Sequence, residues 1–547
     1  MMPGIRTEGD SSHDAGQAQD GADSRSDAMS LVRSTAVFGA LTMVSRVLGL
    51  ARDVVIATVF GSSAATDAFF VAFKIPNFMR RLFAEGAFSH AFVPVLSEYR
   101  TNHDAAAVRT LVSRASGALF LILLVLTILA VLGADYLVMV FAPGFMDDPA
   151  KFGMAADMLR ITFPYLLFIS MVACAQGVLN TYGRFGPPAF APVLLNVILI
   201  ASAWWWTGWF EEPIRALAWG VFIAGIAQLL LMLPFLHAVG MLTLPRPNWR
   251  DSGVRRILRL MLPAVFGSSV AQINLLVDTI LASFLITGSV SWLYYSDRLM
   301  EFPLGVFGVA LGTVILPRLS SEHAASSPAH FSRTLDWALR WAMLIAIPAT
   351  VGLAVMAGPI LSTLFQHGAF TPRDVQAAQL SVVAYAVGLI GFIMVKVLSP
   401  GYFARQDMRT PVKCAATSMV ANMVMSTTAV YLLIDTEVGH AALAAATGVA
   451  AMINAGMLYL GLRRRNVYAP DAGWGRLFGQ IAAATAVMGG VLWLAVGELQ
   501  AWMSAGVGER ILALSGWLLL GVVLYAGTLL LLGLRPRMLR EPAPASD

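Results

Sequence analysis

The stretch SRVLGLARD, residues 45–53, places two arginines and an aspartate inside a hydrophobic segment. An ionisable side chain at bilayer depth costs several kcal/mol, roughly 3 on insertion scales, so such groups normally face a polar cavity and mark a site or pathway. Arginine suits an anion there, because its planar fork stays charged when buried and binds phosphate oxygens in pairs. The pattern therefore predicts a cationic interior built for an anion, with a pyrophosphate as the candidate.

Further ionisable residues interrupt other apolar segments. Arg46 and Asp53 are seven residues apart and share a helix face, whereas Arg81 and Glu85 are spaced as an i,i+4 ion pair. The predicted substrate-binding cations are Arg46, Arg52 and Arg298. Accompanying groups are either cavity and gating residues or a structural ion-pair network, and they comprise Asp53, Asp67, Lys74, Arg80, Arg81, Glu85, Asp297 and Glu301.

Asp278 has no basic neighbour within its own segment. It is therefore a candidate cation or proton site, with pairing to a distant arginine as the alternative. Together with Asn422, Ser426 and Thr447 from later segments it could form an all-oxygen shell suited to a hard cation. Asp278, Asn422 and Thr447 are the predicted ligands of a sodium ion.

The composition is that of a polytopic membrane protein. Of the 547 residues, 58% are hydrophobic and 13% are charged, far from the balance of a soluble domain. Spanning a bilayer takes about 20 apolar residues, and long unbroken apolar runs favour helices over barrel strands. We predict an all-α fold of about fourteen transmembrane helices. They begin near Leu31, Thr66, Ala115, Ala155, Pro188, Arg215, Val254, Ser289, Leu335, Val375, Thr410, His440, Gly473 and Glu509.

An internal repeat predicts two lobes. VAFKIPNFMRRLFAEGAFSHAFVPVLSE (71–98) and YSDRLMEFPLGVFGVALGTVILPRLSSE (295–322) share an aromatic start, central polar groups and a similar end. They lie six segments apart, so both copies have the same orientation, as in parallel-repeat transporters with a site between the lobes. The predicted divisions are a disordered tail (1–29), two pseudo-symmetric six-helix lobes (30–240 and 241–470), two extra C-terminal helices (471–534) and a second tail (535–547).

The charges of the predicted connections orient the chain. Connections on one side carry most of the arginines, whereas those on the other carry Asp147, Asp148, Glu211 and Glu212. By the positive-inside rule, both termini are expected to be cytoplasmic. Topology accounts for the basic balance, so no nucleic-acid partner is expected.

Four longer stretches resemble the hallmark segments of the MurJ/MviN family, part of the MOP exporter superfamily. They are SRVLGLARD (45–53), ATDAFFVAFKIPNFMRRLFAEGAFSHAFVPVLSEY (65–99), GSVSWLYYSDRLMEFPLGVFGVALGTVILPRLS (288–320) and VKVLSPGYFARQDMRTPVK (395–413). That family flips lipid II, the undecaprenyl-pyrophosphate-linked peptidoglycan precursor, across the bacterial cytoplasmic membrane. The resemblance therefore implies an alternating-access transporter of the inner membrane, not an enzyme.

The resemblance also implies residue roles and partners. Arg46, Arg52 and Arg298 match the family's essential cavity arginines, and Asp67 matches its essential acid on the second helix. Asp53, Arg80 and Glu85 match its polar gate network. The implied partners are lipid II, membrane lipids and the cell-wall synthesis machinery, and the apolar segment 471–534 is a candidate groove for the prenyl tail. No cofactor is expected beyond a coupling cation, sodium or proton, with the membrane potential as an alternative drive.

Other functions remain open on the sequence. An exporter of a different prenyl-pyrophosphate-linked glycan would share the helices and the arginines. A drug exporter would need an apolar or acidic cavity, which the arginines argue against. A membrane enzyme acting on prenyl phosphates should carry metal-binding acids or a base on a sizeable aqueous loop, and the sequence shows no such motif.

Overall fold

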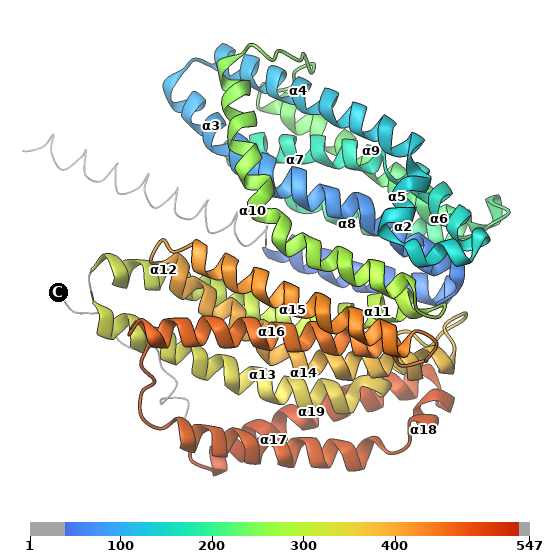
Figure 1. Ribbon diagram of the computed structural model, residues 1–547, viewed down its shortest axis with the longest axis vertical. Helices are drawn as coiled ribbons and strands as arrows, with labels where there is room; N and C mark the ends of the chain where they lie inside the picture. Colours follow the sequence, from blue (N-terminus) through green and yellow to red (C-terminus); the bar gives the residue numbers. More distant parts are fainter. Residues whose placement is uncertain (1–38, 326, 535–547) are drawn as a thin grey trace, which may run out of the picture.

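The computed structural model describes residues 39–325 and 327–534, in which every regular element is a helix. The two tails predicted from the sequence (1–29 and 535–547) lie outside this range. The upper body in Figure 1 is the first lobe. It contains helical residues 39–60, α2 (Ala64–Met79), η1 (Arg80–Phe88), α3 (Ser89–Asn102), α4 (Ala105–Leu132), α5 (Ala134–Phe141), η2 (Pro143–Asp147), α6 (Pro149–Thr162), α7 (Tyr165–Thr181), α8 (Gly186–Ala201), η3 (Ser202–Trp206), η4 (Thr207–Trp209) and α9 (Arg215–Ala238).

The lower body in Figure 1 is the second lobe, with the last helices on its outer side. It contains α11 (Ser289–Pro303), η5 (Leu304–Gly308), α12 (Val309–Ala324), α13 (Pro328–Leu364), α14 (Pro372–Phe403), α15 (Arg409–Leu433), α16 (Gly439–Arg464), α17 (Trp474–Val496), α18 (Leu499–Ser504) and α19 (Val507–Leu531). Between the bodies runs α10 (Ser252–Ser283), which packs on η1, α3 and α4 of the first lobe and on α15 of the second. Although the chain order assigns α10 to the second lobe, its contacts connect both.

The all-α membrane fold is confirmed, and ten helices of the described part are long and apolar enough to cross a bilayer. These ten do not include residues 39–60, α2, α10 or α11, the helices that carry most of the predicted site. α2 and α11 have only 16 and 15 residues before a π-helical segment follows, and helical residues 39–60 carry Arg46, Arg52 and Asp53, so the count of fourteen stays a prediction. One boundary differs clearly: α4 begins at Ala105 rather than near residue 115, because Asp104 caps it by accepting a hydrogen bond from the Ala107 amide.

The two sequence repeats have the same helical construction. The first runs through α2, η1 and α3, and the second through α11, η5 and α12, each interrupted by a π-helical segment. Such segments are rare and occur often at functional sites. When Val71 is aligned with Tyr295, Phe70 falls opposite Tyr294, and these two rings stack with centroids 3.9 Å apart. Equivalent residues therefore touch where α2 meets α11, as expected close to a two-fold pseudo-axis.

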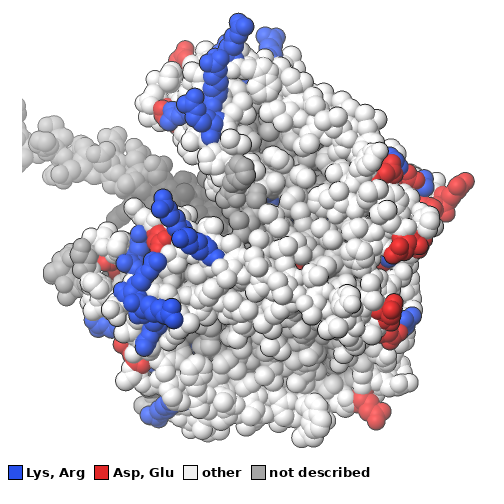
Figure 2. Space-filling model, in the orientation of Figure 1, with Lys and Arg blue, Asp and Glu red and all other residues white. Residues whose placement is uncertain are grey.

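The lobes are joined at one end of the molecule. The apolar core of the first lobe continues into α11 and into the facing ends of α13 and α14, whereas the other end of the second lobe has a separate core around Leu335, Leu398 and Tyr402. Figure 2 shows Lys and Arg gathered at the left, where the lobes diverge, and Asp and Glu prominent at the right. We call these the basic end and the acidic end. The lobes close on each other at the acidic end.

Candidate functional site

A cluster of charged and aromatic groups links the lobes in the interior. Arg52 donates to Asp53 Oδ1 at 2.6 Å, to Asn196 Oδ1 at 3.1 Å and to the Tyr294 hydroxyl at 3.0 Å. Arg52 and Asp53 are only 7% and 1% exposed. Because its donors are already engaged, Arg52 fixes the arrangement of the cluster in this conformation, and little of its guanidinium is available to a ligand.

Arg298 is the more accessible guanidinium of this cluster. Its side chain is 31% exposed, its Nη1 lies 2.6 Å from Glu301 Oε2, and its Nε lies 3.4 Å from Asp53 Oδ2. The same guanidinium lies over the Tyr294 ring, 5.0 Å from the centroid. Arg298 can therefore bind an incoming anion if that anion replaces Glu301.

Arg46 is exposed and lies beside the second π-helical segment. A Cβ atom added to Gly305 of η5 would lie 2.4 Å from Arg46 Nη1, so the glycine leaves room for the guanidinium. Among the described residues, Arg46 makes no hydrogen bond or ion pair, so its donors are the most available to a ligand among the three predicted cations. Lys74 from α2 is attracted by Asp297 and Asp278.

The interior is charge-balanced rather than simply cationic. The basic groups named here are Arg46, Arg52, Lys74 and Arg298, and the acidic groups are Asp53, Asp278, Asp297 and Glu301. The sequence-based expectation of a cationic interior is therefore corrected to one of partly paired charges. Pairing lowers the free-energy penalty of burying these charges when no ligand is bound.

The predicted network on η1 is only partly brought into the site. Arg80 Nε donates to Asn77 Oδ1 at 3.2 Å, and Arg81 is exposed. The side chain of Glu85 lies outside the described residues, so the predicted pair with Arg81 is untested. The α-helical spacing on which that pairing was predicted does not apply here, because the segment is π-helical.

Asp67 lies at the acidic end and joins the lobes. It is fully buried, and Lys151 Nζ of α6 lies 2.9 Å from its Oδ2. Across the interface, the backbone N–H of Gly288 donates to Oδ2 at 2.8 Å, and the N–H and hydroxyl of Ser291 donate to Oδ1 at 3.0 and 2.6 Å. The carboxylate thus caps the N-terminus of α11, where the helix dipole favours negative charge. We call Asp67, Lys151, Gly288 and Ser291 the acidic-end gate.

A second contact across the acidic end was not predicted from the sequence. Trp292 Nε1 donates to Ser62 Oγ at 2.9 Å and to Asp374 Oδ1 at 3.0 Å, and Ser62 also donates to Asp374. Nearby, the Ala369 amide donates to the Thr58 carbonyl at 2.8 Å. These bonds close the first lobe onto α11, the first turn of α14 and the connection that precedes α14.

Asp278 meets the residues predicted to share its site. Asn422 Nδ2 donates to Oδ1 at 3.1 Å and the Thr447 hydroxyl donates to Oδ2 at 3.3 Å. Ser426 donates in turn to the Asn422 side-chain oxygen at 3.2 Å. Lys74 of α2 is also attracted to Asp278. Carboxylate, amide and hydroxyl oxygens fit a hard cation, which would compete here with the ammonium of Lys74.

The comparisons with known proteins identify the family. The family model for the lipid II flippase MurJ matches residues 56–511. The chain belongs to the MurJ lipid II flippase family. A MurJ protein of Vibrio cholerae is 46% identical over 517 residues, covering 93% of this chain and 98% of its own. A lipid II flippase MurJ of Burkholderia cenocepacia is 42% identical, covering 94% of this chain and all of its own.

Solved structures agree with this assignment. A lipid II flippase MurJ in an inward closed conformation is 27% identical, with a TM-score of 0.75, covering 90% of this chain and 98% of its own. An inward-facing MATE multidrug transporter of the MOP superfamily, only 13% identical, has a TM-score of 0.65 over 79% of this chain and 97% of its own. The second likeness shows the shared fold alone. The family resemblance inferred from the four sequence stretches is confirmed, and the chain is a polytopic membrane transporter, not an enzyme.

Proposed function

We propose that this MurJ-family chain moves lipid II from the cytoplasmic to the periplasmic leaflet of the bacterial inner membrane by alternating access. The observation that carries the proposal is the Arg52–Asp53–Tyr294–Arg298 cluster, which joins the lobes inside a molecule closed at the acidic end. A transporter in this state has its site open toward the basic end. By the positive-inside rule that end is cytoplasmic, and so are both termini.

The exposed cations receive the pyrophosphate. Among the residues that the structure describes, Arg46 has no hydrogen-bond or ion-pair partner, and Arg298 is partly exposed and held by Glu301. An anion that takes the place of Glu301 gains a forked donor, while Arg52 keeps Tyr294 and Asp53 in position. The prenyl tail stays in lipid or lies in a groove formed by the apolar helices α17 and α19. The cell-wall synthesis machinery then uses the delivered lipid.

A coupling cation at Asp278 biases the cycle. Its oxygen-rich surroundings suit sodium, and Lys74 provides an alternative positive charge when the ion is absent. The membrane potential is an additional drive, because moving one charge through 100 mV is worth about 2.3 kcal/mol. The cation and the membrane potential both act by shifting the populations of the inward-facing and outward-facing states.

Depletion of the cell's own flippase, with complementation by variants, tests the proposal. We expect Arg298→Ala to accumulate in the membrane yet fail to support growth, with lipid II unavailable to a reagent at the outer surface. Arg298→Lys should rescue poorly because it lacks the planar fork. Arg373→Ala is the matched control, since Arg373 pairs with Glu437 at an exposed site. Normal lipid II exposure in cells carrying Arg298→Ala would overturn the assigned site.

A further inference from the structure

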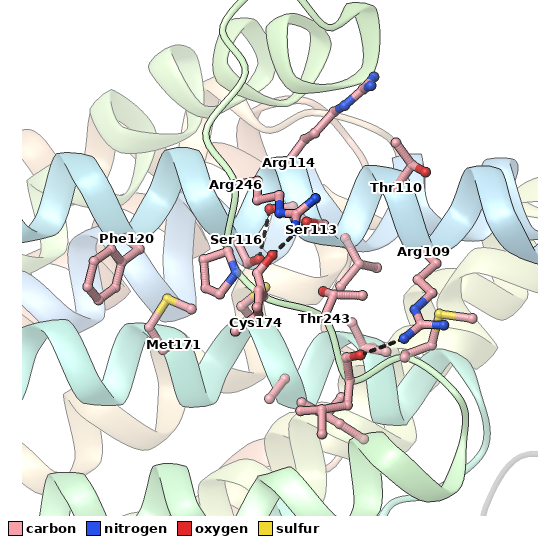
Figure 3. A pocket seen from close by; sticks show the side chains of 18 of the residues that line it. Arg109, Thr110, Ser113, Arg114, Ser116, Phe120, Met171, Cys174, Thr243 and Arg246 are labelled. Carbon is pink, nitrogen blue, oxygen red and sulfur yellow. Dashed lines mark hydrogen bonds between the residues drawn. The ribbon is translucent and has the colours of Figure 1, made fainter.

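The first lobe contains a cavity of about 1270 Å³, separate from the polar interior. Figure 3 shows it between α4, α7 and the chain that follows α9. This volume exceeds the roughly 300–1,000 Å³ typical of small-molecule sites. Most of the inner lining is apolar, and it includes Phe120, Leu167, Phe168, Met171, Leu229 and Leu233.

A strap, residues 241–248, crosses the cavity and is fixed to α4. Ser113 Oγ donates to the Leu244 carbonyl at 2.6 Å, and the Arg246 amide donates to the Ser113 carbonyl at 3.0 Å. Gly117 allows this approach, because a Cβ atom there would lie 2.4 Å from the Arg246 carbonyl carbon. The strap is therefore part of the folded lobe, and the cavity under it is a built feature.

The mouth of the cavity is basic. Arg109 and Arg246 are both exposed, and Arg109 Nη2 donates to the Leu242 carbonyl at 3.2 Å, leaving its other donors available. Arg114 points away from the cavity in Figure 3 and pairs with Asp251 at 2.5 Å. Two guanidinium groups thus stand at the basic end of an apolar chamber between membrane-spanning helices.

We propose that this cavity binds an anionic glycerophospholipid of the leaflet at the basic end. The phosphate lies between Arg109 and Arg246, and an acyl chain lies under the strap against Met171 of α7. Basic pockets between transmembrane helices on the cytoplasmic side select anionic headgroups, and buried methylene groups add affinity. A soluble anion would not account for the apolar lining. The strap leads directly into α10, which contacts both lobes, so the lipid stabilises the connection on which their movement depends.

Photocrosslinking tests the proposal on the full-length protein in nanodiscs. The probes are phosphatidylglycerol and phosphatidylcholine, each with a photoreactive group on one acyl chain, and the crosslinked peptides are mapped by mass spectrometry. We expect phosphatidylglycerol to label peptides of α4, α7 and α9 at least tenfold more than phosphatidylcholine does. Arg109→Ala combined with Arg246→Ala should lower this labelling about tenfold. The control, Arg463→Ala with Arg464→Ala, removes two exposed charges elsewhere and should leave it unchanged.

A second variant tests the chamber without altering charge. Met171→Trp fills the space under the strap and should abolish the crosslinks while both arginines remain. Equal labelling by the two lipids, or labelling that survives both the double variant and Met171→Trp, would overturn the proposal. Displacement of the probe by lipid II but not by unlabelled phosphatidylglycerol would also overturn it, assigning the cavity to the transported lipid. The readout is binding, so it does not depend on the transport proposed above.

Discussion

Removing one hydroxyl should loosen the acidic-end gate without disturbing either lobe. Ser291 is fully buried, and its hydroxyl donates to Asp67 Oδ1 at 2.6 Å across the lobe interface. Ser291→Ala removes this bond but keeps the backbone N–H that donates to the same oxygen at 3.0 Å. A hydrogen bond to a charged group contributes about 1.5–3 kcal/mol. At about 1.4 kcal/mol per factor of ten, the ratio of open to closed gate should rise roughly ten- to hundredfold.

The open fraction can be read from the labelling rate of a gate cysteine. Ser289 is 1% exposed, and its hydroxyl makes no hydrogen bond among the described residues, so Ser289→Cys removes none. In a background without the native cysteines, an impermeant maleimide should label it ten- to hundredfold faster when Ser291→Ala is added. Ser296→Ala is the matched control, because Ser296 is equally buried on α11 but donates to the Ala378 carbonyl within its own lobe.

Ser291→Ala and Ser296→Ala should both lower thermal stability, Ser296→Ala by less, because a hydrogen bond to a neutral carbonyl contributes about 0.5–1.5 kcal/mol. Only Ser291→Ala should accelerate labelling. If both variants label at the wild-type rate, or if both accelerate equally, the Asp67 contact does not hold the gate closed.

Three other outcomes are expected. Asp278→Asn should abolish a rise in melting temperature with sodium over potassium at equal ionic strength, and a wild type indifferent to sodium would exclude the cation site. The Thr410 hydroxyl and Arg465, which follows α16, lower the pKa of Asp407 to about 2. Because the pKa of Asp407 is depressed in the folded state, its ionised form contributes about 1–2 kcal/mol to the free energy of unfolding above pH 4. This contribution should be lost as the pH drops toward 2. In a series of melting temperatures against pH, Asp407→Asn should therefore show less acid dependence than the wild type. Cysteines at Glu211 and Arg464 should label from opposite sides of the membrane, and equal labelling would refute the assigned orientation.

The residue chemistry of the site could be predicted from the sequence. An arginine inside an apolar segment needs a polar environment wherever the helix is placed, so Arg46, Arg52 and Arg298 stand out before any contact is known. The all-α membrane fold could also be predicted, because long apolar runs favour membrane-spanning helices. The repeat could also be recognised in the sequence, because both copies have a similar order of polar and apolar residues.

The partners of those residues depended on the tertiary structure. Lys151 lies far from Asp67 in sequence, yet it is the buried cation beside that carboxylate. The one indication of this role in the sequence was the position of Lys151 on the side of the membrane where acidic residues prevail, which is an exception to the positive-inside pattern. Trp292 and Asp374 gave no comparable signal, because a tryptophan and an N-terminal helix acid are ordinary on their own.

The sequence by itself determined that this is a helical membrane protein with charges buried between two related lobes, because hydropathy and charge are properties of each segment. The tertiary structure decided which charges are paired and which can bind a ligand. Arg52 is committed to Asp53, Asn196 and Tyr294, whereas Arg46 is exposed. That difference arises from the packing of helices distant in the chain, and helical periodicity constrains only the residues of one helix.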